Sequence, residues 1–303
     1  MVNAGEIAHM SHGDISKPLI GEDMGDKDLN IFSKGLGILI EGGLITSIAD
    51  SEELVSEYFP SWDGDREKSV NKDIIDAKGG AIIPGFVDSH THLIWSGDRS
   101  NEMALRQKGL SYSEISKLGG GISKTVESTR NCSISELVNL GLRRVTMALK
   151  LGTTTMEAKS GYGLNAESEL ALLEATSQVN QRSLCDIHAT WLGAHDIPKQ
   201  KSKEEYIDEM INLQLPMVVD QGIAKWADVF CEPGWFTTEE TIEIISASRE
   251  MGLRSRIHVD EFVDSGGLGV ASELGSISAD HVAKSNDESR AIANESGVMQ
   301  TFL

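Results

Sequence analysis

Short apolar segments alternate with longer amphipathic segments after about residue 80, and this alternation restricts the fold more than any other feature. The apolar segments have the length of β-strands, and helical patterns such as 134–152, 166–181, 203–222 and 238–252 lie between them. Strands that alternate with helices imply parallel strands joined by right-handed crossovers. The seven predicted strands are 81–87, 153–157, 185–192, 226–231, 255–259, 276–280 and 297–303.

Polar residues at the ends of these strands distinguish a closed barrel from an open doubly wound sheet. In a (β/α)₈ barrel the chemistry lies at the C-terminal ends of several different strands. An open dinucleotide-binding sheet needs a glycine-rich GxGxxG loop after its first strand, and this sequence has none there. Five predicted strands run into ionisable side chains, among them His90, His92, Glu157, His195, His258 and His281. We therefore predict an α/β fold of the TIM-type (β/α)₈ barrel class over residues 81–303.

The first 80 residues have a different character. Residues 1–28 are polar and show no clear period, whereas residues 29–76 are rich in Ile and Leu. Gly42 and Gly43 are placed as a hairpin turn, and residues 52–59 have the pattern of a short helix. We predict an N-terminal extension and part of a small β-sandwich over residues 1–80.

Charge and composition exclude several classes of partner. The chain has 27 Lys and Arg against 47 Asp and Glu, a formal net charge of −20, which disfavours nucleic-acid backbones and anionic membrane surfaces. No apolar run approaches the roughly 18 residues that span a bilayer, and the N-terminus does not resemble a secretory signal. The three cysteines form no CxxC motif. We expect a cytoplasmic protein with a small-molecule substrate, and a homodimer stays open.

Two histidines separated by one residue directly follow the first predicted strand. Residues i and i+2 of an extended chain point to the same face, so the imidazoles of His90 and His92 can reach one ion. His258, at the end of a later strand, supplies a third imidazole at the same end of a barrel. An HxH pair is also found as structural polar residues at strand ends. The three imidazoles together predict one divalent metal, Zn²⁺ or Fe.

The segment PGFVDSHTHL, residues 84–93, resembles the first-strand signature of the amidohydrolase superfamily. Within that superfamily the chain is similar to the imidazolonepropionase family, because GGGISKTV, KSGYGL and LGAHDIP match its more specific motifs. The matching stretches run in family order from about residue 81 to 282. The resemblance implies a barrel flanked by a small β-sandwich, one divalent metal, and hydrolytic opening of an imidazolone ring to N-formimidoyl-glutamate in histidine degradation.

Catalytic roles follow from the same resemblance. His90, His92 and His258 correspond to metal ligands. Glu261 in HVDEF corresponds to a general base that shuttles the proton, and His281 in SADH to a residue that orients water or polarises the substrate carbonyl. The residues suit this chemistry, because a divalent metal activates water at neutral pH and a nearby carboxylate can carry a proton to the leaving nitrogen.

Substrate binding requires a cation, because an imidazolone propionate carries a carboxylate. Arg99 in SGDRS matches the family position, and a guanidinium can hold a carboxylate through two hydrogen bonds. Tyr162 in KSGYG and His195 in LGAH are expected in the same pocket, together with Glu261. Tyr112 in LSYSE is a further candidate for substrate binding.

The sequence departs from the family at its end. The family's eighth strand carries an Asp that completes the metal site, but residues 297–303 form only the seventh predicted strand. We therefore expect an incomplete barrel and a truncated sequence. Lys159 ends the second strand, whereas the superfamily places its carboxylated bridging lysine on the fourth, so one metal is expected rather than two. A related deaminase of heterocyclic bases and a catalytically inert fragment stay open as alternatives.

Overall fold

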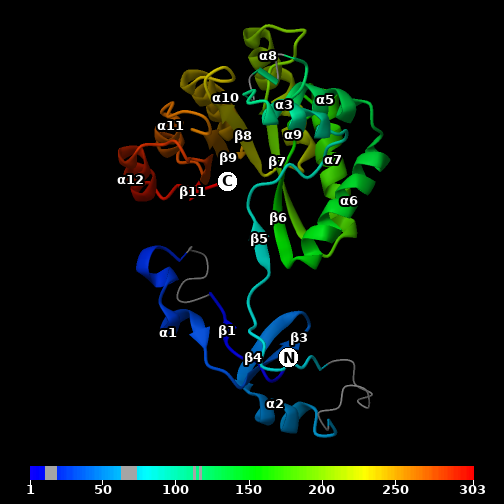
Figure 1. Ribbon diagram of the computed structural model, residues 1–303, viewed down its shortest axis with the longest axis vertical. Helices are drawn as coiled ribbons and strands as arrows, with labels where there is room; N and C mark the ends of the chain where they lie inside the picture. The colour runs from blue at the N-terminus through cyan, green and yellow to red at the C-terminus, as the bar shows by residue number, and fades with distance from the viewer. Residues whose placement is uncertain (11–18, 63–73, 112–113, 116–117) are drawn as a thin grey trace. The chain divides into compact units, whose positions relative to one another are not determined.

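The computed structural model describes residues 1–10, 19–62, 74–111, 114–115 and 118–303 (Figure 1). These residues form two compact units, Met1–Gly85 and Phe86–Leu303. The division follows Gly85, five residues beyond the boundary expected at residue 80. Each unit has an apolar cluster of its own, around Ile7 and Ile38 in the first and around the sheet in the second.

The N-terminal unit contains two small antiparallel sheets. Strand β3 (Leu36–Glu41) pairs with β4 (Leu44–Asp50), while β1 (Ile7–Ala8) pairs with β2 (Ile31–Phe32). The predicted turn at Gly42 and Gly43 is confirmed, and both glycines have positive φ angles, 59° and 84°. The predicted short helix is α2 (Ser51–Tyr58). Two short helices, η1 (Gly21–Met24) and α1 (Lys27–Asn30), complete the described elements. The partial β-sandwich stays a prediction.

The second unit is built on one parallel sheet that curls, with helices along its outer side (Figure 1). All seven predicted strands are present, and their order in the sheet follows their order in the chain. In the described residues β5 (Phe86–Asp88) and β11 (Met299–Thr301) are the two edge strands of this sheet. The strands are β5 (Phe86–Asp88), β6 (Thr153–Lys159), β7 (Asp186–Ala194), β8 (Trp226–Cys231), β9 (Arg254–Val259), β10 (Ser278–His281) and β11 (Met299–Thr301).

The first strand of the sheet is shorter than predicted. The prediction began it at residue 81, but β5 begins at Phe86. Ile82 forms a parallel bridge with Ile7 instead, so this segment belongs to the N-terminal unit. Pro84 lies between the two pairings, where the missing N–H suits the interruption of a strand.

Helices cover the outer side of the sheet in chain order (Figure 1). Helix α6 (Ile134–Lys150) packs on β6, α7 (Ala166–Arg182) on β7, α10 (Thr238–Glu250) on β8 and α12 (Asp287–Glu295) on β11. The predicted helix over 203–222 is divided by a π-helical turn at Met210–Gln214, just before Pro216, whose missing N–H disfavours a regular α-helix there. The helices are α3 (Met103–Gln107), α5 (Ile122–Arg130), α6 (Ile134–Lys150), α7 (Ala166–Arg182), α8 (Lys203–Glu209), α9 (Leu215–Gln221), α10 (Thr238–Glu250), α11 (Gly267–Glu273) and α12 (Asp287–Glu295), with a short 3₁₀ turn, η2 (Ser100–Glu102).

The two faces of the sheet differ in chemistry. Side chains alternate between faces along a strand, so Ala227 and Val229 on β8 point into the apolar core beneath the helices. Asp228 between them lies on the other face, where it contacts Lys159 of β6 and His258 of β9. The inner face is therefore where buried polar side chains gather. In the described residues no helix is both long and apolar enough to cross a membrane.

Two helical glycines, Gly141 of α6 and Gly269 of α11, differ in the space around them and allow a matched test of helix packing. A Cβ at Gly141 of α6 would lie 2.6 Å from Ile94 Cδ1 and 2.8 Å from Val179 Cγ2, whereas a Cβ at Gly269 of α11 meets nothing within 4 Å. Ala favours a helix over Gly by about 1 kcal/mol, and overpacking a core costs about 1–3 kcal/mol.

Gly269→Ala is therefore expected to raise the free energy of unfolding, and Gly141→Ala to lower it. Urea unfolding followed by circular dichroism measures both variants. Equal effects of the two substitutions would contradict the tight packing at Gly141.

Candidate metal and substrate site

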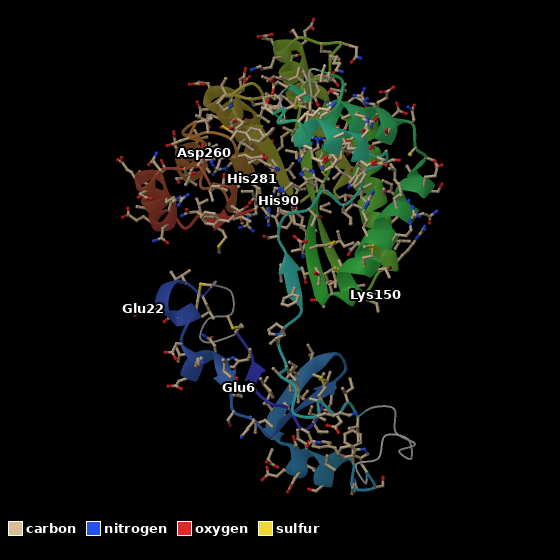
Figure 2. All side chains as sticks on the ribbon, in the orientation of Figure 1. Glu6, Glu22, His90, Lys150, Asp260 and His281 are labelled. Carbon is tan, nitrogen blue, oxygen red and sulfur yellow. The ribbon has the colours of Figure 1, made fainter. Side chains whose placement is uncertain are left out.

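Histidines from four different strands gather at the C-terminal edge of the sheet. His90 follows β5 and His195 follows β7, while His258 lies near the end of β9 and His281 ends β10. Figure 2 shows His90 and His281 close together, and their ring centroids are 5.3 Å apart. The strand ends are therefore brought to one place, as a barrel requires.

His90, His258 and His281 are the tightest histidine group. One ligand nitrogen from each lies within 4.8 Å of those of the other two. The ring of His92 lies 5.5 Å from that of His90 and 5.8 Å from that of His258. The structure thus places His281, which was predicted to act on water or substrate, as close to the predicted ligands as they are to one another.

Two carboxylates hold the rings of His90 and His258. Asp280 Oδ2 lies 2.7 Å from His90 Nδ1, and Asp228 Oδ1 lies 3.0 Å from His258 Nδ1. An ionised carboxylate can only accept a hydrogen bond, so each Nδ1 carries its proton. The opposite nitrogen of each ring, Nε2, faces away from the carboxylate, and in the described residues the buried Nε2 of His258 has no hydrogen-bond partner.

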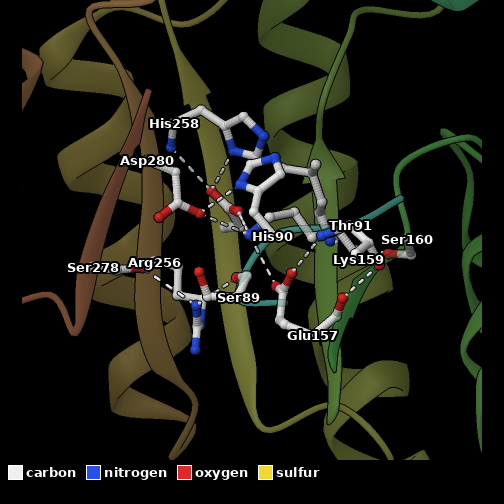
Figure 3. A network of polar contacts seen from close by, with 12 residues as sticks. Ser89, His90, Thr91, Glu157, Lys159, Ser160, Arg256, His258, Ser278 and Asp280 are labelled. Carbon is white, nitrogen blue, oxygen red and sulfur yellow. Dashed lines mark hydrogen bonds and ion pairs between the residues drawn. The ribbon is translucent and has the colours of Figure 1, made fainter. Parts of the chain in front are cut away.

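A fully buried lysine joins these carboxylates. Lys159 Nζ lies 2.7 Å from Asp228, 2.9 Å from Glu157 and 3.2 Å from Asp280 (Figure 3). Burial alone would lower the pKa of Lys159, but the three carboxylates more than offset it and raise that pKa above its usual value. Burial likewise opposes ionisation of Asp228, yet His258 and Lys159 together lower the pKa of its carboxyl. Lys159 therefore carries a positive charge and is paired with three carboxylates.

These donors fit a divalent metal. Burial lowers the pKa of His90 to about 3 and of His281 to about 4, and it lowers the pKa of His92 well below its usual value. At neutral pH these rings are neutral, the form that binds Zn²⁺ or Fe²⁺. In the described part of the chain, His92 Nδ1 and Asp280 Oδ1 are also buried without hydrogen-bond partners. Unpaired buried acceptors of this kind are costly unless something binds them.

A pocket of about 150 Å³ opens beside the histidines. It brings together four residues predicted from separate motifs, Arg99, Tyr162, His195 and Glu261, with the predicted ligands His92 and His258. Ile122, Phe230 and Phe262 supply apolar walls. A remaining predicted residue, Tyr112, lies outside the described residues.

Arg99 is held at the pocket by a buried carboxylate. Its Nε and Nη2 donate to Glu102 at distances of 2.7–3.0 Å, and Glu102 also accepts from the Gly121 N–H at 2.9 Å. Hydrogen bonds from Arg99, partly offset by desolvation, lower the pKa of Glu102. The guanidinium is therefore fixed in direction by the loop that follows β5.

The loop with Tyr162 is anchored in the same way. Glu169 on α7 is completely buried and accepts backbone hydrogen bonds from Gly161, Gly163 and Leu164 at 2.7–3.0 Å. The Tyr162 ring lies 5.2 Å from that of His195. His195 Nδ1 lies 2.9 Å from the Gly161 carbonyl, which can only accept, so the His195 Nε2 lone pair is available.

Glu261 lies on a loop that a third carboxylate holds. Glu232 accepts from the backbone N–H groups of Glu261, Phe262 and Val263 at 3.0–3.1 Å. Glu261 Oε2 faces His281 Nε2 at 3.5 Å. Burial raises the pKa of Glu261, and the charge of Glu232 adds to this rise. This carboxylate therefore exchanges a proton more readily near neutral pH than an exposed one does.

Sequence reasoning assigned no role to the charged residues behind the pocket. Asp228 is a lone charge within the apolar strand WADVFC, a signal that could have marked it as paired and buried. Glu157 and Lys159 share one face through their i, i+2 spacing, another available signal. Asp280 precedes His281, but its contact with His90 spans 190 positions and has no local signature.

Known proteins resemble the whole chain as well as its motifs. The model of the amidohydrolase family matches residues 73–130. Imidazolonepropionase from Symbiobacterium thermophilum is 39% identical over 306 residues, covering 100% of this chain and 68% of that protein. Imidazolonepropionase from Alkaliphilus metalliredigens is 43% identical over 235 residues, covering 77% of this chain and 56% of that protein. The chain thus spans between 56% and 68% of the length of these two curated relatives.

Solved structures show the same fold at low identity. 5-Methylcytosine deaminase from Klebsiella pneumoniae, liganded with 5-fluorocytosine, gives a TM-score of 0.59 at 14% identity over 99% of this chain and 64% of that one. A mutant atrazine chlorohydrolase from Arthrobacter aurescens, complexed with zinc and atraton, gives 0.55 at 13% identity over 100% and 64%. Both have the same type of α/β fold as this chain, and the second structure contains zinc.

The contacts between Glu232 and the backbone of the loop that contains Glu261 can be tested without substrate. Gln in this position keeps the size but offers one acceptor oxygen, so at least one of the three backbone bonds is lost. In Glu232→Gln we expect amide hydrogen exchange at residues 261–263 to become about 10-fold faster. Exchange followed by mass spectrometry measures it, with the exposed Glu243→Gln on α10 as control. Identical exchange in both variants would refute the anchor.

Proposed function

The chain belongs to the imidazolonepropionase family, and on that premise we propose that it hydrolyses the cyclic amide of 4-imidazolone-5-propanoate to N-formimidoyl-L-glutamate. The reaction would use one divalent metal, zinc or iron. The observation that supports this most directly is the pocket in which Arg99 and Glu261 lie beside His92 and His258. A carboxylate anchor, a general base and metal-binding imidazoles are the groups that opening such a ring requires.

His90, His92 and His258 are the proposed metal ligands. The buried ring nitrogens His258 Nε2 and His92 Nδ1, both without a described partner, support this assignment. When bound, a divalent metal supplies a Lewis acid and activates water at neutral pH. His281 lies within reach of the same point and is proposed to orient the water or polarise the substrate carbonyl.

Glu261 is proposed as general base and proton shuttle. Its carboxylate would take a proton from the attacking water and pass it to the ring nitrogen that leaves as the amide C–N bond breaks. Its 3.5 Å separation from His281 Nε2 puts both groups at the same side of the pocket. The raised pKa of Glu261 favours the first half of this transfer, in which the carboxylate takes the proton from water.

Arg99 is proposed to bind the propionate of the substrate. Its contacts with Glu102 fix the guanidinium plane at the pocket wall, which lowers the entropy cost of binding. Tyr162, His195 and Tyr112 are proposed to hydrogen-bond the ring or the propionate. A cytoplasmic location, a homodimer and the absence of nucleic-acid partners stay predictions.

Replacing Glu261 tests the proton shuttle. In Glu261→Gln we expect turnover of imidazolone propionate, followed as loss of imidazolone absorbance, to fall about 10²–10⁴-fold. Zinc content should stay unchanged, since Glu261 is not a proposed ligand. His258→Ala is the matched variant, and it should lose metal and turnover together. Normal turnover in Glu261→Gln would exclude the role.

Replacing Arg99 tests the substrate class. Arg99→Lys keeps the charge but loses the two-pronged geometry, so we expect KM to rise about 10-fold or more with a smaller change in kcat. Arg182→Lys on α7, an exposed position, is the control. The alternative, a deaminase of uncharged heterocyclic bases, predicts ammonia release from such a base and no effect of Arg99→Lys on its KM.

A further inference from the structure

The buried charges behind the histidines point to a role that the proposed reaction does not yet assign. We propose that Lys159, Asp228 and Asp280 form a positioning cluster, which fixes the ring orientation and the tautomer of His90 and His258 before a metal binds. This inference rests on the proposed metal site but is independent of the substrate. None of the three residues lines the pocket.

The cluster connects one ammonium to two imidazoles through two carboxylates. Figure 3 shows Lys159, Asp280 and the two histidine rings. On one side, Lys159 Nζ donates to Asp228 Oδ2 at 2.7 Å, while Asp228 Oδ1 accepts from His258 Nδ1 at 3.0 Å. On the other side, Asp280 Oδ2 lies 3.2 Å from Lys159 Nζ and 2.7 Å from His90 Nδ1. The side chains of Lys159, Asp228 and Asp280 are all 0% exposed, so water does not compete for these contacts.

Each carboxylate selects one tautomer of its histidine. Because the ammonium is bound to both carboxylates, they face the imidazoles as acceptors and draw the ring proton to Nδ1. The Nε2 lone pairs are then directed away from the carboxylates. A carboxylate behind a metal-binding histidine orients the ring and raises its affinity for the metal. Loss of such a carboxylate typically lowers metal affinity 10- to 100-fold.

The charges of the cluster also favour a cation nearby. Three carboxylates, those of Glu157, Asp228 and Asp280, contact the single ammonium of Lys159. The two aspartates alone outnumber the ammonium, and burial makes an uncompensated charge expensive. A divalent ion at the neighbouring histidines would supply the balancing positive charge.

Glu157 ties the same cluster to the backbone between His90 and His92. Thr91 Oγ1 donates to the Glu157 carbonyl at 2.6 Å, and the Lys159 N–H donates to the Thr91 carbonyl at 2.8 Å. The residue between the two histidines is therefore fixed to β6 beyond the end of β5. Side-chain and backbone contacts position the HxH segment together.

The experiment uses the metal-free chain labelled with ¹⁵N-histidine. Long-range ¹H–¹⁵N spectra distinguish the tautomers, and wild-type His90 and His258 should each show a single form with the proton on Nδ1. Asp280→Leu should convert only His90 to a mixture of tautomers, and Asp228→Leu only His258. Lys159→Met should affect both. Each aspartate variant leaves Lys159 with two carboxylates, so these variants keep the test decisive if Lys159→Met does not fold.

Zinc affinity, measured by competition with a chromophoric chelator, is the second readout. We expect it to fall about 10- to 100-fold in each cluster variant. Lys225→Met is the matched control, because the exposed Lys225 also contacts a histidine, His188, at 3.4 Å, but outside the cluster. Its zinc affinity should equal that of the wild type.

The outcomes separate the cluster from the proposed reaction. Unchanged tautomers and zinc affinity in the two aspartate variants would overturn the positioning role. The expected changes in tautomers and affinity, in a chain that does not consume imidazolone propionate, would support the cluster and refute the proposed substrate.

Discussion

The ion pairs of Lys159 are the constraint on which the rest of the sheet depends. Both faces of a parallel sheet are covered in this kind of fold, so a strand such as β8 cannot send Asp228 to solvent. Each unpaired buried charge costs several kcal/mol, and pairing offsets this only when geometry is good. Lys159 meets three carboxylates at 2.7–3.2 Å, which makes a charged inner face tolerable. The apolar outer face can then pack against the helices.

Three loops of the pocket are held in the same way, by a buried carboxylate that accepts backbone hydrogen bonds. Glu102 binds the Arg99 side chain and accepts from the Gly121 N–H. Glu169 accepts from the loop with Tyr162, and Glu232 accepts from the loop with Glu261. Loops at strand ends lack ladder hydrogen bonds, so their N–H groups need other acceptors. A carboxylate offers four acceptor positions and holds several N–H groups at once. Loop residues thereby acquire the rigidity that a binding site requires.

Local patterns predicted the strands, most helices and the HxH segment, because these depend on residues close in sequence. The periods of two and 3.6 residues are visible in any short window. Long-range pairings are not: Lys159 and Asp228 are 69 positions apart, and His90 and Asp280 are 190 apart. The start of β5 was misplaced for the same reason, since Ile82 pairs with Ile7 across 75 positions. The motif resemblance found the pocket residues but not the carboxylates that hold them.

Four histidines lie near the proposed metal, and they differ in what contacts their rings. His90 and His258 each have a carboxylate at Nδ1, so their free nitrogens have a fixed direction. In the described residues His92 Nδ1 has no partner, and its ring stacks on that of His195 at 4.8 Å. His281 ends β10 with a φ angle of 81°, an unfavourable conformation that the neighbouring turn must hold. The carboxylates behind His90 and His258 suit the permanent ligation proposed for them, and His92, the third proposed ligand, is held by its stack on His195. His281, which faces Glu261, suits the contact with water or substrate proposed for it.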